Sequence, residues 1–182
     1  GKQGLTGLEF AGGIPGTVGG AVYMNAGAQG SDLSRVLKYA EVLLDNGELV
    51  HLGASELDFS YRHSRLQEMN AIVTEAVLEL EYGDRKEIAA AMATYKDRRL
   101  RTQPLQSPSC GSVFRNPEGH HAAKLIEEAG LKGYRVGGAE VSTLHANFIV
   151  NTGNAKASDV LTLIAFIQAR VLEQFGVRLS PE

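Results

Sequence analysis

The chain is organised around one stretch, Gly111-Ser112-Val113-Phe114-Arg115-Asn116-Pro117. A serine precedes two residues that favour strands, and the Asn-Pro pair then ends the extended run before a helical pattern. This order predicts that Ser112 sits on a turn at the mouth of a fold, where functional side chains are commonly placed. Serines in such turns more often bond to their own backbone than react, so the stretch alone leaves the role of Ser112 open.

The sequence on the carboxyl side of this stretch predicts two helices and two strands. They are a short helix over 121–129 closed by Gly130, strands over 135–141 and 146–151, and a long helix that starts at a Ser158 cap and stops at Gly176. The apolar positions of the long helix recur at helical spacing and predict its buried face: Leu161, Ile164, Ile167, Val171, Leu172 and Phe175.

The sequence on the amino side predicts mainly strands. Residues 38–52 form a hairpin pattern in which Asn46-Gly47 supplies the positive φ angles of a tight turn. Alternating residues over 71–82 predict a further strand, and 86–101 has a helical pattern with basic residues at its end. Those basic residues complement the helix dipole, which favours a solvated helix end over a ligand clamp. The fold class is therefore α+β, with a mainly antiparallel sheet.

Composition narrows the class of protein. The 182 residues are 43% hydrophobic and carry a formal charge of −3, which gives no reason to expect nucleic acid as a partner. No run is long and apolar enough for a membrane helix, and no signal-peptide pattern opens the chain. The single cysteine, Cys110, cannot form an internal disulfide and is expected to be an inert packing residue. We expect a cytoplasmic protein with no bound metal and no obligate protein partner.

Glycines gather near the start of the chain. Gly13, Gly16, Gly19 and Gly20 surround a proline and form a loop whose backbone amides can approach a ligand closely, with phosphate as the usual guest. The spacing matches neither the dinucleotide fingerprint nor the Walker loop. A phosphate cradle and a plain tight turn both remain open on spacing alone.

Four stretches together resemble one family, the flavin-dependent UDP-N-acetylenolpyruvoylglucosamine reductases of bacterial cell-wall synthesis. Their order and separation match the family across essentially the whole chain. They are the glycine loop 13–20 with Asn25-Ala26-Gly27, the segment Tyr61-Arg62-His63-Ser64, the stretch 111–117, and the closing Leu179-Ser180-Pro181-Glu182.

The resemblance implies a fold and a domain organisation. Residues 1–101 would be the latter part of a vanillyl-alcohol-oxidase-type FAD-binding domain, 102–157 a small α+β substrate-binding domain, and 158–182 a helix and strand that return to the first domain. The family's amino-terminal segment has no counterpart, and both ends look cut, so we expect a piece of a longer protein. There is no room between Phe59 and Ala71 for the inserted tyrosine-bearing loop of some members, which indicates the shorter type.

The resemblance also implies the reaction. NADPH would reduce bound FAD, and the flavin would pass hydride to the enolpyruvyl double bond of UDP-N-acetylglucosamine enolpyruvate, giving UDP-N-acetylmuramate. Arg62 would grip the substrate carboxylate as negative charge develops there, which suits a bidentate guanidinium. Ser112 would donate the proton to the adjacent carbon, and Glu182 would be a second electrostatic partner of the carboxylate.

The remaining site residues also come from the resemblance. Tyr61, Arg62, Asn116 and His145 would bind the nucleotide-sugar substrate, although His145 could equally be a hydrogen-bonded strand-end histidine. Gln29 stands where many members carry tyrosine, which puts an aromatic contact there in doubt. The residues implied to bind FAD are Gly13, Ile14, Pro15, Gly16, Thr17, Gly19, Gly20, Asn25, Ala26 and Gly27.

Two other functions stay open from the sequence. The first is a different flavin oxidoreductase on the same scaffold, in which Ser112 is only structural. The second is a non-catalytic fragment that binds a nucleotide sugar and cannot hold FAD.

Overall fold

The computed structural model describes all residues, 1–182, and divides them into two compact units. The first unit is Gly1–Asp97 and the second is Arg98–Glu182, so helix α2 (Arg85–Thr102) crosses the boundary. Each unit has its own buried hydrophobic cluster. The predicted α+β class is confirmed. None of the helices combines the length and the apolar composition needed to cross a lipid bilayer.

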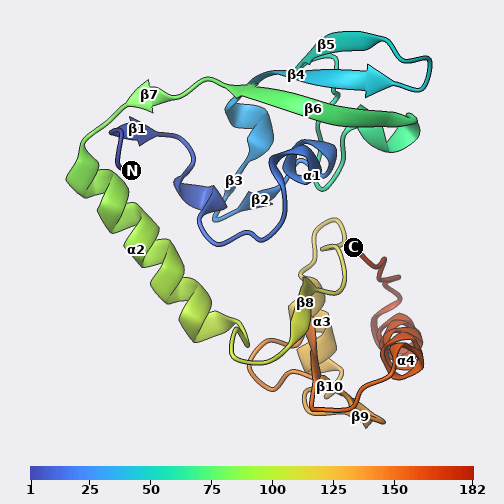
Figure 1. Ribbon diagram of the computed structural model, residues 1–182. Coiled ribbons are helices and arrows are strands. Elements are labelled where there is room, and N and C mark those ends of the chain that lie inside the picture. The colour runs from blue at the N-terminus through green and yellow to red at the C-terminus, as the bar shows by residue number, and fades with distance from the viewer. The chain divides into compact units, whose positions relative to one another are not determined.

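The first unit contains a three-stranded antiparallel sheet, which lies along one side of the unit (Figure 1). Its order is β5-β4-β6, with β4 at Leu37–Leu44, β5 at Leu49–Gly53 and β6 at Ala71–Leu78. The predicted hairpin is confirmed as β4 and β5. Its turn differs in detail, because only Gly47 has a positive φ, at 83°. The amide of Gly47 donates to the Leu44 carbonyl, so the loop is a turn followed by one left-handed glycine.

The strand predicted over 71–82 breaks into two. β6 ends at Leu78, and β7 (Glu81–Tyr82) pairs instead with β1 (Leu5–Thr6) near the start of the chain. Within β6 the register against β4 shifts between the pairs Glu41↔Glu75 and Val42↔Val73, which skips Thr74. A bulge of this kind reverses the alternation of side chains. Val73 therefore packs on the core, while Ile72 is 65% exposed. In a strand without the bulge, Ile72 would face the core and Val73 would face away from it.

Short elements cover one face of this sheet. Helix α1 (Val18–Tyr23) packs against β6, and a Cβ added at Gly19 would lie 3.4 Å from the Val73 carbonyl oxygen, in van der Waals contact with the strand. Besides α1, the short elements are η1 (Glu9–Ala11), β2 (Gly27–Ala28), β3 (Ser31–Asp32), η2 (Leu33–Arg35) and η3 (Arg65–Glu68).

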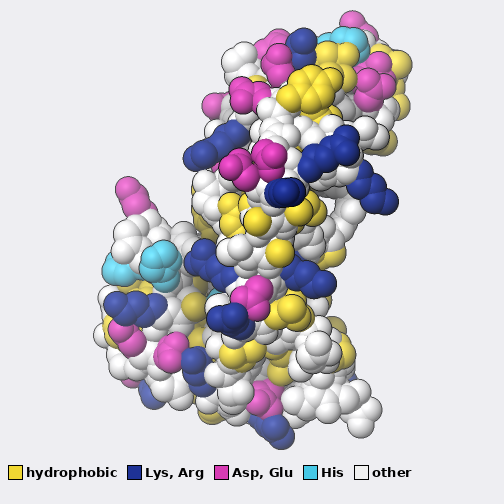
Figure 2. Space-filling model, turned by 90° about the vertical axis from the view of Figure 1, so that its left-hand side faces the viewer, with side chains coloured by type: hydrophobic (Ala, Val, Ile, Leu, Met, Phe, Trp, Pro, Cys, Tyr) yellow, Lys and Arg dark blue, Asp and Glu magenta, His cyan; other side chains and the backbone are white.

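Helix α2 is exposed over most of its length, and of its residues only Ile88 is buried. Figure 2 faces this helix and shows Lys and Arg side chains mixed with acidic and hydrophobic ones along it. Near its carboxyl end Arg99 Nε donates to Gln103 Oε1 at 3.3 Å. Arg98 and Arg101 are exposed there, as expected for the predicted solvated helix end, where basic residues complement the dipole.

The second unit is a four-stranded antiparallel sheet covered on one face by two helices. The strand order is β8-β11-β10-β9. Val141 and Ile149 point from the sheet into a core that includes Leu163, Ile167 and Val171 of α4. The elements are β8 (Ser109–Ser112), α3 (Ala122–Glu128), β9 (Arg135–Val136), β10 (Ala139–Val141), β11 (Phe148–Asn151) and α4 (Ala157–Phe175).

The observed division differs from the three segments expected from the sequence. Residues 102–157 and 158–182 lie in one compact unit, because the buried face of α4 closes the core over β9 and β10. The observed boundary follows Asp97, inside α2, whereas the sequence placed it after residue 101. The buried face predicted for α4 is also wrong in part: Leu161, which was expected to be buried, is 66% exposed, and Leu163 is fully buried instead.

The prediction that Ser158 caps the start of α4 is wrong. The helix begins at Ala157, so Ser158 lies inside its first turn. Asp159 makes the end contacts instead, because its Oδ2 accepts hydrogen bonds from the amides of Lys156 at 2.9 Å and Gly138 at 3.3 Å. These backbone bonds, from Lys156 first and Gly138 second, lower the pKa of the Asp159 carboxyl below its ordinary value of 3.8. The carboxylate thus ties the helix start to the turn between β9 and β10.

The ionised Asp159 should stabilise the second unit in a pH-dependent way. A depressed folded-state pKa favours the folded state above the unfolded value, and the advantage disappears as pH falls through the folded value. We expect Asp159→Asn to lower the melting temperature at pH 7 and to have little effect at strongly acid pH. Thermal unfolding of both proteins from pH 3 to 7 measures this. Glu173→Gln, which removes a charge from an exposed ion pair on the same helix, should change little.

Candidate active site

Ser112 is the last residue of β8 and lies opposite Phe148 of β11. It is exposed, and its hydroxyl makes no hydrogen bond within the chain. Two residues later Phe114 is only 1% exposed and anchors the strand in the core. The structural alternative required the serine to bond its own backbone, and that bond is not present. The hydroxyl is therefore held on a fixed strand end and is free to meet a ligand.

The carboxyl-terminal segment, residues 179–182, runs beside this strand end. Phe114 and Pro181 form an antiparallel bridge. The Glu182 amide donates to the Val113 carbonyl at 2.9 Å, and the Arg115 amide donates to the Ser180 carbonyl at 2.9 Å. Glu182 is thus placed next to the residue that follows Ser112. These bonds hold Pro181 and Glu182 as an ordered extended segment.

Helix α4 supports this segment from behind. Leu179 is 1% exposed, and its carbonyl accepts a hydrogen bond from Gln168 Nε2 at 2.8 Å. A buried leucine and a side-chain bond fix the segment three residues before Glu182. Of the predicted catalytic residues, Ser112 and Glu182 are therefore brought together within the second unit.

Arg62, the third predicted catalytic residue, belongs to the first unit and lies in a tight turn. Ser60 and His63 exchange backbone hydrogen bonds of 3.1 Å, with Tyr61 and Arg62 between them. Arg62 has a φ of 55°, a left-handed conformation that is uncommon outside glycine. Its guanidinium carbon lies 5.2 Å from the centroid of the Tyr61 ring. Non-glycine residues held this way are concentrated at functional sites.

The Arg62 turn is fixed by side chains that the sequence did not reveal. Gln67 Nε2 donates to the Arg62 carbonyl at 3.1 Å and to the Tyr23 carbonyl at 3.1 Å. Ser64 is fully buried and donates its hydroxyl to the same Tyr23 carbonyl at 2.7 Å. The turn is thus tied to the end of α1, and so to the glycine loop.

Asn25 also supports this turn. It is 2% exposed, its Nδ2 donates to the Ser60 carbonyl at 3.0 Å, and its Oδ1 accepts from the Ser34 amide at 3.0 Å. The sequence placed Asn25 among the FAD-binding residues. Its side chain faces the interior, so any contact with a cofactor would come from its backbone. Asn25 has a left-handed φ of 43°, and its neighbours Ala26 and Gly27 are half-buried.

The glycine loop is accessible along most of its length. Gly16 has a φ of 124°, and a Cβ added there would meet no atom within 4 Å. Thr17 caps α1, because its hydroxyl oxygen accepts the Gly20 amide at 3.0 Å. The loop therefore presents backbone with open space beside it, which fits the close approach of a diphosphate such as that of FAD.

Asn116 and His145 have structural partners in the second unit. Asn116 Oδ1 accepts the Ala122 amide at 3.0 Å and so holds the start of α3. His145 lies between β10 and β11, where Nδ1 accepts the Asn147 amide at 3.3 Å and the ring meets Phe148 edge-on at 4.8 Å. Burial lowers the pKa of His145. The imidazole is therefore neutral at pH 7, with Nε2 as its donor.

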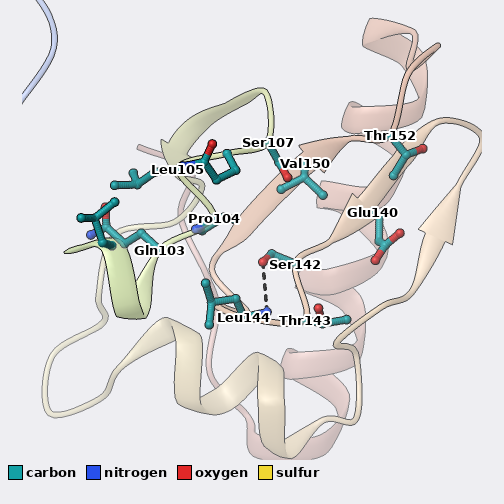
Figure 3. A pocket seen from close by; sticks show the side chains of 12 residues that line it. Gln103, Pro104, Leu105, Ser107, Glu140, Ser142, Thr143, Leu144, Val150 and Thr152 are labelled. Atoms are coloured by element: carbon teal, nitrogen blue, oxygen red, sulfur yellow. Dashed lines mark hydrogen bonds between the residues drawn. The ribbon is translucent and has the colours of Figure 1, made fainter. Parts of the chain in front are cut away.

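The second unit also contains a pocket of about 440 Å³ that the sequence did not predict (Figure 3). It lies between residues 103–107 and the face of β10 and β11 that carries Glu140, Ser142 and Val150. Ser142 Oγ accepts the Leu144 amide at 3.2 Å at its lower edge. None of the predicted site residues lines this pocket.

Comparisons with known proteins identify the family of the chain. Residues 1–53 match the family model of an FAD binding domain, and residues 103–182 match that of the UDP-N-acetylenolpyruvoylglucosamine reductase C-terminal domain. A UDP-N-acetylenolpyruvoylglucosamine reductase of Bacillus licheniformis is 56% identical over 176 residues, which cover 96% of each chain. The chain belongs to the UDP-N-acetylenolpyruvoylglucosamine reductase family.

Other reductases of this family are longer. The one from Anoxybacillus flavithermus is 55% identical over all 182 residues, which make up 60% of its own length. The crystal structure of the UDP-N-acetylenolpyruvylglucosamine reductase from Thermus caldophilus superposes with a TM-score of 0.87 at 43% identity, over 100% of this chain and 65% of that one. The chain thus spans about 60% of the length of several curated relatives that it matches. The resemblance to this reductase family is confirmed.

Proposed function

We propose that the full-length protein containing this chain is a cytoplasmic, FAD- and NADPH-dependent reductase. It converts UDP-N-acetylglucosamine enolpyruvate to UDP-N-acetylmuramate in peptidoglycan synthesis. The observation that carries the proposal is the free Ser112 hydroxyl on a strand end beside Glu182, in a chain that belongs to this reductase family. FAD, when bound, supplies hydride taken from NADPH to the enolpyruvyl double bond.

The glycine loop binds the cofactor. Backbone amides of the loop 13–20 meet its diphosphate, except those of Ile14 and Gly20, which donate to the Ala11 carbonyl and to Thr17 Oγ1. The open space at Gly16 supports that contact. The backbone of Asn25-Ala26-Gly27 lies near the flavin, since the Asn25 side chain is engaged with Ser60 and Ser34. Tyr61, Asn116 and His145 contact the nucleotide sugar, with the neutral His145 donating from Nε2.

Three side chains act on the substrate's enolpyruvyl group. Arg62 grips the carboxylate as negative charge develops there, which a planar guanidinium does with two parallel hydrogen bonds. Glu182 is a second electrostatic partner of the same carboxylate. Ser112 gives its hydroxyl proton to the carbon next to the carboxylate from one face. The missing internal bond of the Ser112 hydroxyl supports this role, because no competing acceptor holds the proton.

Separate half-reactions test the proposal. In the full-length protein under anaerobic conditions, NADPH should bleach the flavin, and UDP-N-acetylglucosamine enolpyruvate should then restore its colour with formation of UDP-N-acetylmuramate. Stopped-flow absorbance and mass spectrometry of the product measure both. A reduced flavin that this substrate does not reoxidise would favour a different flavin oxidoreductase on the same scaffold.

A non-catalytic role remains the second candidate for the 182-residue chain by itself. FAD titration of the isolated chain separates the two. A colourless chain that takes up no FAD, yet changes spectroscopically on addition of the enolpyruvyl nucleotide sugar, is a binding module. A yellow chain that oxidises NADPH contradicts that candidate.

A further inference from the structure

Asn147 is the residue that holds the Ser112 strand end in place. It lies between His145 and β11 and is only 4% exposed. Its carbonyl accepts the Val113 amide at 2.8 Å, its Oδ1 accepts the Phe114 amide at 3.0 Å, and its Nδ2 donates to the Phe114 carbonyl at 2.8 Å. One residue thus binds the two positions that follow Ser112.

These bonds continue the sheet beyond its last regular pair. β8 ends at Ser112, and the register against β11 is already irregular there. The side-chain amide of Asn147 then stands in for a backbone amide, since it offers one acceptor and one donor to the same residue, Phe114. The fourth backbone group of this dipeptide, the Val113 carbonyl, accepts the amide of Glu182. Asn147 therefore fixes the strand from one side, and the carboxyl-terminal segment pairs with it from the other.

The donor and acceptor of the Asn147 side chain match the carbonyl and amide of Phe114, so position 147 specifically requires asparagine. Both side-chain bonds of Asn147 are buried, and a buried amide or carbonyl that loses its partner is costly. Leucine has a similar size but would leave both polar groups of Phe114 unsatisfied. Aspartate keeps an acceptor for the Phe114 amide, but it can donate to the Phe114 carbonyl only when protonated.

We propose that Asn147 is a positioning residue for proton donation by Ser112 and for the carboxyl group of Glu182. It touches neither substrate nor cofactor and acts by setting the direction of the strand that carries both contacts. The inference rests on the proposed reductase function. A shift of about 1 Å in a reacting group can cost about a hundredfold in rate, so a small movement of this strand end suffices.

Asn147→Leu in the full-length protein tests the proposal. Reduction of the flavin by NADPH should stay within about twofold of the natural rate, because Ser112 has no part in that step. Reoxidation by UDP-N-acetylglucosamine enolpyruvate should slow by about tenfold to a hundredfold. Ile149→Ala is the matched control: Ile149 is a buried residue of β11 on the core side, so its loss destabilises the unit without touching the Phe114 bonds.

Each outcome bears on a different statement. Unchanged reoxidation in Asn147→Leu overturns the proposal, and so does an equal slowing of reoxidation in Ile149→Ala at a similar loss of melting temperature. A natural protein that the enolpyruvyl substrate does not reoxidise overturns the proposed function instead, whatever Asn147 does.

A second variant carries the test if Asn147→Leu does not fold. In Asn147→Asp the lost bond to the Phe114 carbonyl returns when the new carboxyl group takes up a proton. The reoxidation rate relative to the natural protein should therefore rise towards acid pH. A ratio that is flat with pH, or that rises towards alkaline pH, contradicts a positioning role through Phe114.

Discussion

Ser112→Ala should leave reduction of the flavin by NADPH intact and nearly stop turnover of the enolpyruvyl substrate. The variant removes only a hydroxyl that makes no hydrogen bond within the chain, so the fold loses no internal contact. Proton transfer by a positioned side chain commonly contributes about 10²–10⁴ in rate, and we expect a loss of that size in the second half-reaction. Stopped-flow measurement of each half-reaction in the full-length protein separates the two effects.

Ser109→Ala is a matched control for this variant. Ser109 lies on the same strand, is also exposed, and pairs with Val150 of β11. Its hydroxyl takes no part in the proposed chemistry, so both half-reactions should keep their rates. If Ser112→Ala turns over the substrate as fast as Ser109→Ala, Ser112 is not the proton donor, and another flavin oxidoreductase becomes the better hypothesis.

Elements with local signals could be predicted from the sequence. Gly130 and Gly176 end α3 and α4 where expected, with φ angles of 72° and 69°. The hairpin of β4 and β5 follows from a turn between two apolar runs. In each case the residues that decide the structure lie within a few positions of one another, so a local pattern is sufficient.

The failures come from contacts between distant residues. The bulge at Thr74 depends on how β6 pairs with β4, and no pattern within 71–82 marks it. The start of α4 is set by hydrogen bonds that the amides of Lys156 and Gly138 donate to the Asp159 carboxylate. The serine at position 158, a favourable capping residue, did not reveal these bonds. Asn25 was assigned to the cofactor through a resemblance, which names a position but not the direction of its side chain.

For the candidate site, too, short motifs could be predicted from the sequence and contacts between distant residues could not. Ser112 and Glu182 could be named from short motifs, while the bonds that join their strands required the structure. Asn147 had a weak signal, a polar residue next to the apolar run 148–150 that became β11. An asparagine there is also compatible with an ordinary turn, so its three bonds to Val113 and Phe114 could not be inferred beforehand.

Arg62→Gly should give a protein that is as stable as the natural one and nearly inactive on the enolpyruvyl substrate. Arg62 has a φ of 55°, and a left-handed conformation costs a non-glycine residue about 1–2 kcal/mol. Glycine adopts it freely, so the melting temperature should hold or rise, although glycine's greater freedom in the unfolded chain offsets part of the gain. The loss of a fixed cation at developing charge should lower kcat/KM by about 10²–10³.

Asp58→Gly is the matched control for Arg62→Gly, because it also places glycine at a left-handed position but keeps the Arg62 guanidinium. Asp58 is exposed in the same unit, and its φ of 44° is also left-handed. Both glycine variants should therefore unfold at similar temperatures, and only Arg62→Gly should lose turnover while its flavin is still reduced by NADPH. If Arg62 has only a structural role, Arg62→Gly should keep its turnover of the enolpyruvyl substrate and should unfold at a lower temperature than Asp58→Gly. Steady-state kinetics and thermal unfolding of the two full-length variants therefore show whether the strained Arg62 is needed for turnover of the substrate or only for the structure of the turn.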